Sequence, residues 1–262
     1  MDKAGSAPTL AGWYVISLRP SGGHAPVRRA AAALGARLLP VSTLKLVPVD
    51  AGPALAAALA SPWVVFTSPA AVAFAQEAQG VQTLRARAGQ RWLAVGSGTA
   101  MALRSAGIAE VAIPERRADS EGLLARPELQ SLPGIDVGLV TAPGGRGLIG
   151  ETLAQRGARV HLAAVYRRTA ITPSPARLRR LDDLPGMSAL LVSSAEAFDG
   201  LWSRLPPPAR ARLAARPVVA SSPRLAAMLA ALGFAAIVLA QGASPSRLLA
   251  ALAADVGSGR FR

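Results

Sequence analysis

"VVFTSPAAVAF" (64–74) and "LLVSSAEAF" (190–198) repeat one pattern 126 residues apart. In each stretch an apolar run, typical of a buried strand, ends in two hydroxyl residues and continues into a helix-like segment that carries an aromatic side chain. A strand that leads directly into a helix is the building unit of parallel sheets in α/β proteins. The two stretches therefore decide the fold class.

The repeat extends over most of the chain. The shift of 126 places Ser68 on Ser194, and a shift of 122 places Gly35 of "LGAR" on Gly157 of "RGAR". Phrases that recur in the same order at nearly one spacing indicate an internal duplication. The period of about 125 residues is the size of a domain.

Each copy alternates apolar strands with Ala/Leu-rich amphipathic helices. This alternation predicts an α/β fold, with two similar doubly wound parallel sheets that carry helices on both faces. The strands are expected at 13–18, 38–41, 63–66, 92–95 and 111–113, and at 137–141, 160–165, 189–192, 218–220 and 237–239.

The composition favours a globular chain without a disulfide or a metal cluster. The 262 residues are 51% hydrophobic, with no cysteine and only His24 and His161 as histidines. The N-terminus has no apolar core of signal-peptide length, and Gly233 interrupts the longest apolar run, 225–240. We therefore expect a cytoplasmic protein that makes no contact with a membrane.

The net charge of +14 points to acidic small molecules as partners. Only two of the 29 basic residues are lysines, so almost all of the positive charge is arginine. Arginine forms forked hydrogen bonds with carboxylates and phosphates. Arginine-rich codon usage would produce the same bias. No nucleic-acid partner is expected, because no basic tract exceeds two residues and aromatics make up only 4% of the chain.

Hydroxyl residues and glycines gather where the predicted strands end. Ligands of doubly wound sheets bind at these carboxyl ends, next to helix N-termini that attract anions. The same serines and threonines would also serve as helix N-caps. Both interpretations stay open at this point.

Familiar catalytic motifs are missing. "GGRG" (144–147) lacks the Gly-Lys-Ser/Thr of a phosphate-binding P-loop, and "GSGTAM" (96–101) has Met101 where a dinucleotide site needs a small residue. There is no Gly-x-Ser-x-Gly elbow, and neither histidine has a plausible serine or aspartate partner in the sequence. We expect no cofactor.

In its ordered set of phrases the chain resembles the uroporphyrinogen-III synthase family, from about residue 13 to residue 254. The phrases are "SLRP" (17–20), "VVFTSPAAV" (64–72), "AVGSGTAMAL" (94–103), "SEGLLA" (120–125), "GGRGLIGETLAQRGARV" (144–160), "VYRR" (165–168) and "VVASSPRLAAMLAALGF" (218–234). The resemblance implies two α/β domains that are joined by two linker strands and enclose a cleft. One domain is expected at 13–39 plus 172–256, the other at 50–163, and the linker strands at 40–49 and 164–171.

The resemblance also implies a cyclising hydro-lyase. Its substrate, the polycarboxylate hydroxymethylbilane, would close to uroporphyrinogen III with loss of water and inversion of ring D through a spiro intermediate. Tyr166 is the expected catalytic residue, because a phenol is protonated at neutral pH and can donate to the departing hydroxyl. The expected substrate-binding residues are Arg19, Ser68, Ser97, Thr99, Gly144, Gly145, Arg146, Ser194, Ser221 and Ser222.

Two other classes of function remain open. A two-lobed binding protein for an acidic small ligand would share this architecture. A regulator that binds a tetrapyrrole is the second alternative, although such a regulator would need an additional DNA-binding domain. A structural role of Tyr166 between the linker strands is also open, and we expect a monomer.

Overall fold

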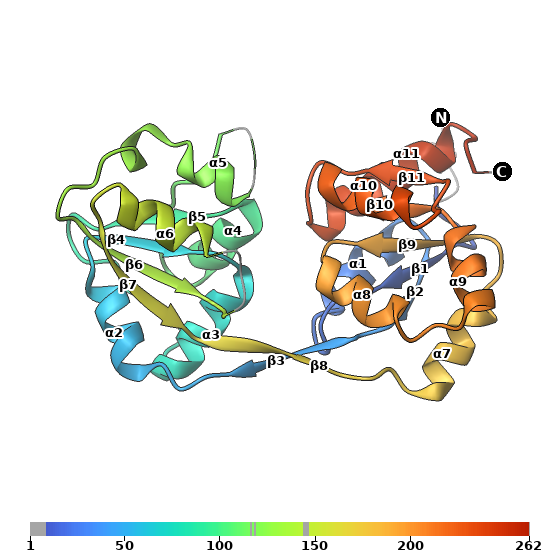
Figure 1. Cartoon of the computed structure of the whole chain (residues 1–262), viewed down its shortest axis with the longest axis horizontal. Coiled ribbons are helices and arrows are strands. Elements are labelled where there is room, and N and C mark those ends of the chain that lie inside the picture. Colours follow the sequence, from blue (N-terminus) through green and yellow to red (C-terminus); the bar gives the residue numbers. More distant parts are fainter. Residues whose placement is uncertain (1–8, 116, 118, 144–146, 262) are drawn as a thin grey trace, which may run out of the picture. The chain divides into compact units, whose positions relative to one another are not determined.

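The computed structural model describes residues 9–115, 117, 119–143 and 147–261. The chain divides into two compact units: unit 1 consists of Met1–Lys45 and Thr169–Arg262, and unit 2 consists of Leu46–Arg168. Segments from the two ends of the chain therefore share one sheet in unit 1, where blue and orange strands lie side by side (Figure 1).

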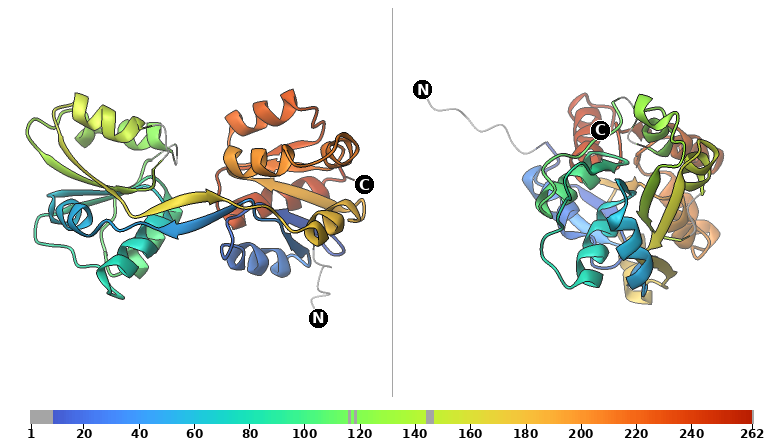
Figure 2. Two further views of the ribbon diagram at one scale, coloured as in Figure 1. Left: turned by 60° about the horizontal axis from the view of Figure 1, so that its bottom comes forward. Right: turned by 90° about the vertical axis from the view of Figure 1, so that its left-hand side faces the viewer.

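Unit 1 is built on a parallel five-stranded sheet in the order β11-β10-β9-β1-β2. Helices α8 and α10 pack on one face, and α1 and α11 pack on the other (Figure 2). The strands are β1 (Tyr14–Ser17), β2 (Arg37–Pro40), β9 (Ser188–Val192), β10 (Val218–Ala220) and β11 (Ile237–Leu239). The helices are α1 (Ala25–Ala33), α7 (Pro175–Asp182), α8 (Ala195–Trp202), α9 (Pro207–Ala214), α10 (Pro223–Ala231) and α11 (Pro245–Gly257).

Unit 2 is built on a parallel four-stranded sheet in the order β5-β4-β6-β7. Helices α2, α3 and α4 pack on one face, and α5 and α6 pack on the other. The strands are β4 (Trp63–Phe66), β5 (Arg91–Ala94), β6 (Asp136–Thr141) and β7 (Arg159–Ala164). The helices are α2 (Gly52–Ala60), α3 (Pro69–Gln79), α4 (Ser97–Ser105), α5 (Ser120–Leu124), α6 (Leu148–Gln155) and the short 3₁₀ helix η1 (Pro127–Leu129).

The chain passes between the units twice, through β3 (Leu44–Pro48) and β8 (Tyr166–Ala170), which form a separate two-stranded sheet. Backbone hydrogen bonds tie the ends of this pair: Ile171 N–H donates to Thr43 O at 2.8 Å, and Val49 N–H donates to Val165 O at 3.1 Å. Tyr166 therefore lies at the first position of a strand that is held by its neighbour.

Burial on both faces explains the apolar runs that mark the strands. Val64 and Phe66 of β4 pack toward α3 and α4, whereas Val65 packs toward α5 and α6, and all three are fully buried. A central parallel strand needs apolar side chains on both faces, so its sequence shows a continuous run. In the described part of the chain, no helix is long and apolar enough to cross a membrane.

The strand pairing reproduces the duplication found in the sequence. In unit 2, Val64 of β4 lies opposite Gly138 of β6. The equivalents of these residues, at shifts of 126 and 122, are Leu190 and Ile16, which lie opposite each other in unit 1. Each unit thus combines strands from both copies in the same order and register, and the predicted α/β class with parallel sheets is confirmed.

The segment 111–113 departs from the strand prediction. Only one bridge forms there, between Leu93 and Ala112. This segment lies at the edge of the sheet and has a single neighbour, and Pro114 directly after it has no N–H to extend the ladder. Its equivalent in unit 1, β11, pairs over three residues.

Candidate functional site

Unit 2 contains a cavity of about 680 Å³ where its strands end. Small-molecule sites in proteins usually measure roughly 300 to 1,000 Å³. The apolar part of the wall comes from β6, β7 and α6, while hydroxyl groups and charged side chains line the rest. The lining residues central to its chemistry are Thr67, Ser68, Ser120, Thr141, Glu151, Tyr166 and Arg168.

A pair of hydroxyl groups, Ser68 and Tyr166, lies in the cavity wall. Ser68 Oγ and Tyr166 Oη are 3.0 Å apart, and Ser68 Oγ also accepts the N–H of Ala71 at 3.1 Å as the N-cap of α3. The Tyr166 ring stacks on Phe74, with 5.2 Å between the ring centroids, and Tyr166 is only 5% exposed. Strand, helix cap and aromatic contact therefore fix the phenol in one position.

Further polar groups of the cavity were not among the predicted residues. Thr67 Oγ1 donates to Thr141 Oγ1 at 2.8 Å, which joins the ends of β4 and β6. Arg168 lines the cavity and donates to Pro143 O at 3.3 Å. Residues two apart on a strand share a face, so the spacing of Tyr166 and Arg168 in "VYRR" was a usable signal.

The serines predicted in unit 1 cap helices at the equivalent strand ends. Ser194 Oγ accepts the N–H of Ala197 at 3.3 Å, and Ser222 Oγ accepts the N–H of Leu225 at 3.4 Å. Ser221, directly before Ser222, follows β10. The N-cap interpretation is thus confirmed for Ser68, Ser194 and Ser222, and it leaves the helix N-termini available to anions.

Arg19 follows β1 in unit 1 and is half-buried. Its guanidinium donates to Ala243 O at 2.7 Å, and among the described residues it has no carboxylate partner. Burial lowers the pKa of Arg19 from its ordinary value. A half-buried cation without a counterion is a candidate for binding a ligand carboxylate.

The remaining predicted residues lie apart from these groups or outside the described part of the chain. Ser97 is the exposed first residue of α4, and Thr99 is buried within the same helix at 4% exposure; neither lines the cavity of unit 2. Gly144, Gly145 and Arg146 lie outside the described residues, so their role remains a prediction.

Both histidines have partners that the sequence alone did not reveal. His161 Nε2 donates to Asp136 Oδ1 at 2.8 Å, and Asp136 also accepts two hydrogen bonds from Arg159. These bonds hold the pKa of the Asp136 carboxyl well below its ordinary value. His24 instead contacts two serines in unit 1, Ser17 and Ser42.

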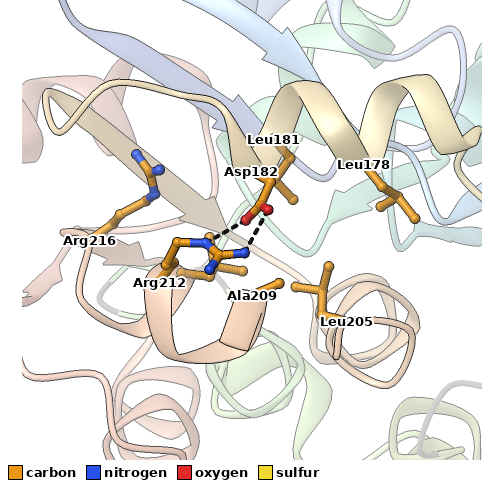
Figure 3. Close-up of a pocket in the computed structure, with 8 residues that line it drawn as sticks. Leu178, Leu181, Asp182, Leu205, Ala209, Arg212 and Arg216 are labelled. Atoms are coloured by element: carbon orange, nitrogen blue, oxygen red, sulfur yellow. Dashed lines mark hydrogen bonds and ion pairs between the residues drawn. The ribbon is translucent and has the colours of Figure 1, made fainter. Parts of the chain in front are cut away.

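A second, small hollow lies between α7 and α9 in unit 1, and its charged side chains bind other groups of the chain. Figure 3 shows Arg212 and Asp182 facing each other across it, joined by two hydrogen bonds of 2.6 Å. Arg216 donates to the carbonyls of Leu184 and Pro185 at 2.9 and 2.8 Å. The hollow measures only about 20 Å³, so its charged groups bind the chain itself rather than a ligand.

Sequence comparisons identify relatives over most of the chain. The family model described as uroporphyrinogen-III synthase HemD matches residues 26–250. A uroporphyrinogen-III synthase of Escherichia coli is 35% identical over 70% of this chain and 74% of that protein. One of Salmonella typhimurium is 37% identical over 62% of this chain, and the match spans 66% of that protein.

Solved structures show the same fold. A mutant uroporphyrinogen III synthase of Thermus thermophilus aligns with a TM-score of 0.56 at 23% identity, over 92% of this chain and 98% of that one. A uroporphyrinogen-III synthetase of Helicobacter pylori aligns with a TM-score of 0.59 at 14% identity, over 94% of this chain and 99% of that one. The matching family model and the 35% identical protein of Escherichia coli show that the chain belongs to the uroporphyrinogen-III synthase family.

Proposed function

We propose that this chain closes linear hydroxymethylbilane to uroporphyrinogen III, with loss of water and inversion of ring D through a spiro intermediate. The observation that carries the proposal is the Ser68–Tyr166 hydroxyl pair in the wall of the 680 Å³ cavity. Family membership supplies the reaction, and the cavity supplies a phenol and apolar walls for pyrrole rings. The enzyme would act as a cytoplasmic monomer without a cofactor.

The first proton transfer follows from the hydrogen bonds of this pair. With Ser68 donating its proton to Tyr166 Oη, the phenol keeps its own proton for the substrate. Tyr166 then donates this proton to the hydroxymethyl group and becomes a phenolate. The C–O bond breaks, so water departs and an azafulvene cation remains. The substituted carbon of ring D attacks this cation and gives the spiro intermediate, whose bond to the neighbouring bridging carbon then breaks. The unsubstituted carbon of ring D re-forms the bond to that bridging carbon, and the proton that it loses as the ring regains aromaticity restores the phenol. The overall balance is one water per bilane.

Positioning must decide which carbon of ring D attacks. The bilane also cyclises without an enzyme, to the isomer in which ring D is not inverted. A hundredfold preference between the two routes requires only about 2.8 kcal/mol of differential stabilisation. Contacts that hold the substrate in one orientation can supply this amount without a nucleophile or a metal.

Acidic arms of the substrate would bind at strand ends in both units. Arg19, Ser68, Ser97, Thr99, Ser194, Ser221 and Ser222 are the proposed partners, with Gly144, Gly145 and Arg146 carried over from the sequence. Ser68 caps a helix N-terminus in unit 2 and Ser194 caps one in unit 1, and each N-terminus is proposed to attract one acidic arm.

The proposal is tested by incubating the protein with hydroxymethylbilane, oxidising the products and separating the isomers. We expect isomer III to replace isomer I. A product mixture that matches the spontaneous reaction would contradict the proposed synthase and favour a binding protein, whose bilane affinity calorimetry would then reveal.

Arg19→Gln should raise the KM for hydroxymethylbilane about tenfold and leave kcat nearly unchanged. A hydrogen bond to a charged group contributes about 1.5–3 kcal/mol, and binding of a remote arm stabilises substrate and transition state alike. Arg37→Gln is the matched control, because Arg37 is exposed at the opposite, amino end of the same sheet. Equal KM values for the two variants would remove Arg19 from the site.

A further inference from the structure

His24 lies between the carboxyl ends of β1 and β2 and is 9% exposed. Its two ring nitrogens contact two different serines: Nδ1 lies 3.1 Å from Ser17 Oγ, and Nε2 lies 2.7 Å from Ser42 Oγ. A buried imidazole with a partner on each nitrogen can take only the proton arrangement that both partners accept.

The protons of this network can be assigned one by one. A carbonyl only accepts, so Ser42 gives its single hydroxyl proton to Arg19 O, at 2.9 Å. Ser42 Oγ must then accept from His24, which places a proton on Nε2. In a neutral ring Nδ1 is bare, so it accepts the hydroxyl proton of Ser17. Ser17 Oγ in turn accepts the backbone N–H of Arg19, at 3.4 Å.

These four hydrogen bonds form a closed ring that begins at the N–H of Arg19 and returns to its carbonyl oxygen. Each donor is used once, and no two lone pairs face each other. The opposite tautomer would point the Nε2 lone pair at Ser42 Oγ, which has already donated its proton to Arg19. The ring therefore fixes the backbone of Arg19, whose guanidinium is anchored separately on Ala243 O.

We propose that His24 is a positioning residue that closes this ring as the neutral tautomer with its proton on Nε2, and thereby holds Arg19 in place for a substrate carboxylate. The last part rests on the proposed function of Arg19. The tautomer and the ring stand on the geometry of unit 1 alone.

Burial, together with the surrounding positive charges, keeps His24 neutral. Burial lowers its pKa to about 4, and Arg28 of α1, Arg177 of α7 and Arg19 itself contribute to this shift by repulsion. A second proton would have to sit on Nδ1, where it meets the hydroxyl proton of Ser17. Ser17 is only 1% exposed, so this hydroxyl would lose its acceptor in a buried place.

The tautomer is tested directly by NMR on protein labelled with ¹⁵N in histidine. The chain has only two histidines, so the spectrum of His161→Gln assigns His24. We expect a protonated Nε2 and a bare, hydrogen-bonded Nδ1 at pH 7, with titration at about pH 4. A proton on Nδ1 at pH 7, or titration near the ordinary value of 6.5, would overturn the proposal.

The positioning role is tested by kinetics with hydroxymethylbilane. Ser42→Ala and His24→Ala should each raise KM about tenfold with kcat within about twofold, and His24→Gln, which retains a donor and an acceptor, should recover most of the loss. In an Arg19→Gln background the same changes should add little, because they act through Arg19.

The outcomes separate the two ideas. If Arg19→Gln leaves KM unchanged, the proposed role of Arg19 fails. The NMR result then still decides whether His24 carries its proton on Nε2 and closes the ring of hydrogen bonds. If Arg19→Gln raises KM but Ser42→Ala and His24→Ala do not, the positioning role of His24 is overturned. Ser42→Ala keeps the imidazole, so a folding defect of His24→Ala cannot hide either result.

Discussion

Tyr166→Phe is expected to lower the rate of uroporphyrinogen III formation about a hundredfold. Proton transfer by a positioned side chain contributes roughly 10²- to 10⁴-fold to catalysis, and the substitution removes only the hydroxyl oxygen. The stacking of the ring on Phe74 and its burial are retained, so KM and folding should change little. Spontaneous closure continues meanwhile, so the share of isomer I should rise.

The measurement is the initial rate of isomer III formation together with the ratio of isomers after oxidation. Tyr14→Phe is the matched control, since Tyr14 is the other tyrosine of the chain and its hydroxyl contacts Arg37 at the amino end of β1. Ser68→Ala should have a smaller effect than Tyr166→Phe, because it removes a partner of the phenol and not the phenol. A Tyr166→Phe variant with the rate of Tyr14→Phe would leave Tyr166 a purely structural role.

The fold could be predicted because its determinants are local and occur twice. The runs 63–66 and 218–220 have the bounds of β4 and β10, because a strand buried on both faces differs clearly from its polar ends. The duplication further implies that the two units share one strand order, and the structure agrees: Val64 lies opposite Gly138, and their equivalents Leu190 and Ile16 lie opposite each other. The segment 111–113 was predicted too strongly, because one edge partner and a following proline limit it to a bridge.

The site was less accessible to prediction because its groups come from separate loops. Ser68 was identifiable as a hydroxyl at a strand end, but its contact with Tyr166 joins positions 98 residues apart. Ser17, His24 and Ser42 have no common spacing in the sequence, and only the pairing of β1 with β2 brings them together. Composition predicts which residue types can bind an acid, whereas the positions of the loops determine which of them meet.

Gly138→Ala should lower the free energy of unfolding of unit 2 by about 3 kcal/mol, the upper end for overpacking a core. Gly138 lies in β6 beneath α2, where an added Cβ would sit 2.7 Å from Cα of Ala58 and closer still to its carbonyl oxygen. These atoms belong to a helix backbone, so no side-chain rotation relieves the clash, and α2 must move off the sheet. The equivalent residue of unit 1 is the fully buried Ile16, so the close approach belongs to unit 2 and is not required by the shared fold.

Urea unfolding monitored by tryptophan fluorescence measures this loss in a Trp13→Phe/Trp202→Phe background, because the remaining tryptophans, Trp63 and Trp92, both lie in unit 2. Gly52→Ala is the matched control: Gly52 is the first residue of α2, the helix that lies over Gly138, and a new Cβ there meets only Asp50 Oδ1, at 3.7 Å. The effect should reach the site too, since β6 ends three residues later at Thr141, whose hydroxyl accepts from Thr67 in the cavity wall. A Gly138→Ala protein as stable as Gly52→Ala would mean that α2 and β6 are not packed at backbone contact. If stability falls while the isomer ratio is retained, the cavity tolerates a displaced β6, and its selectivity then resides in the Ser68–Tyr166 side of the wall.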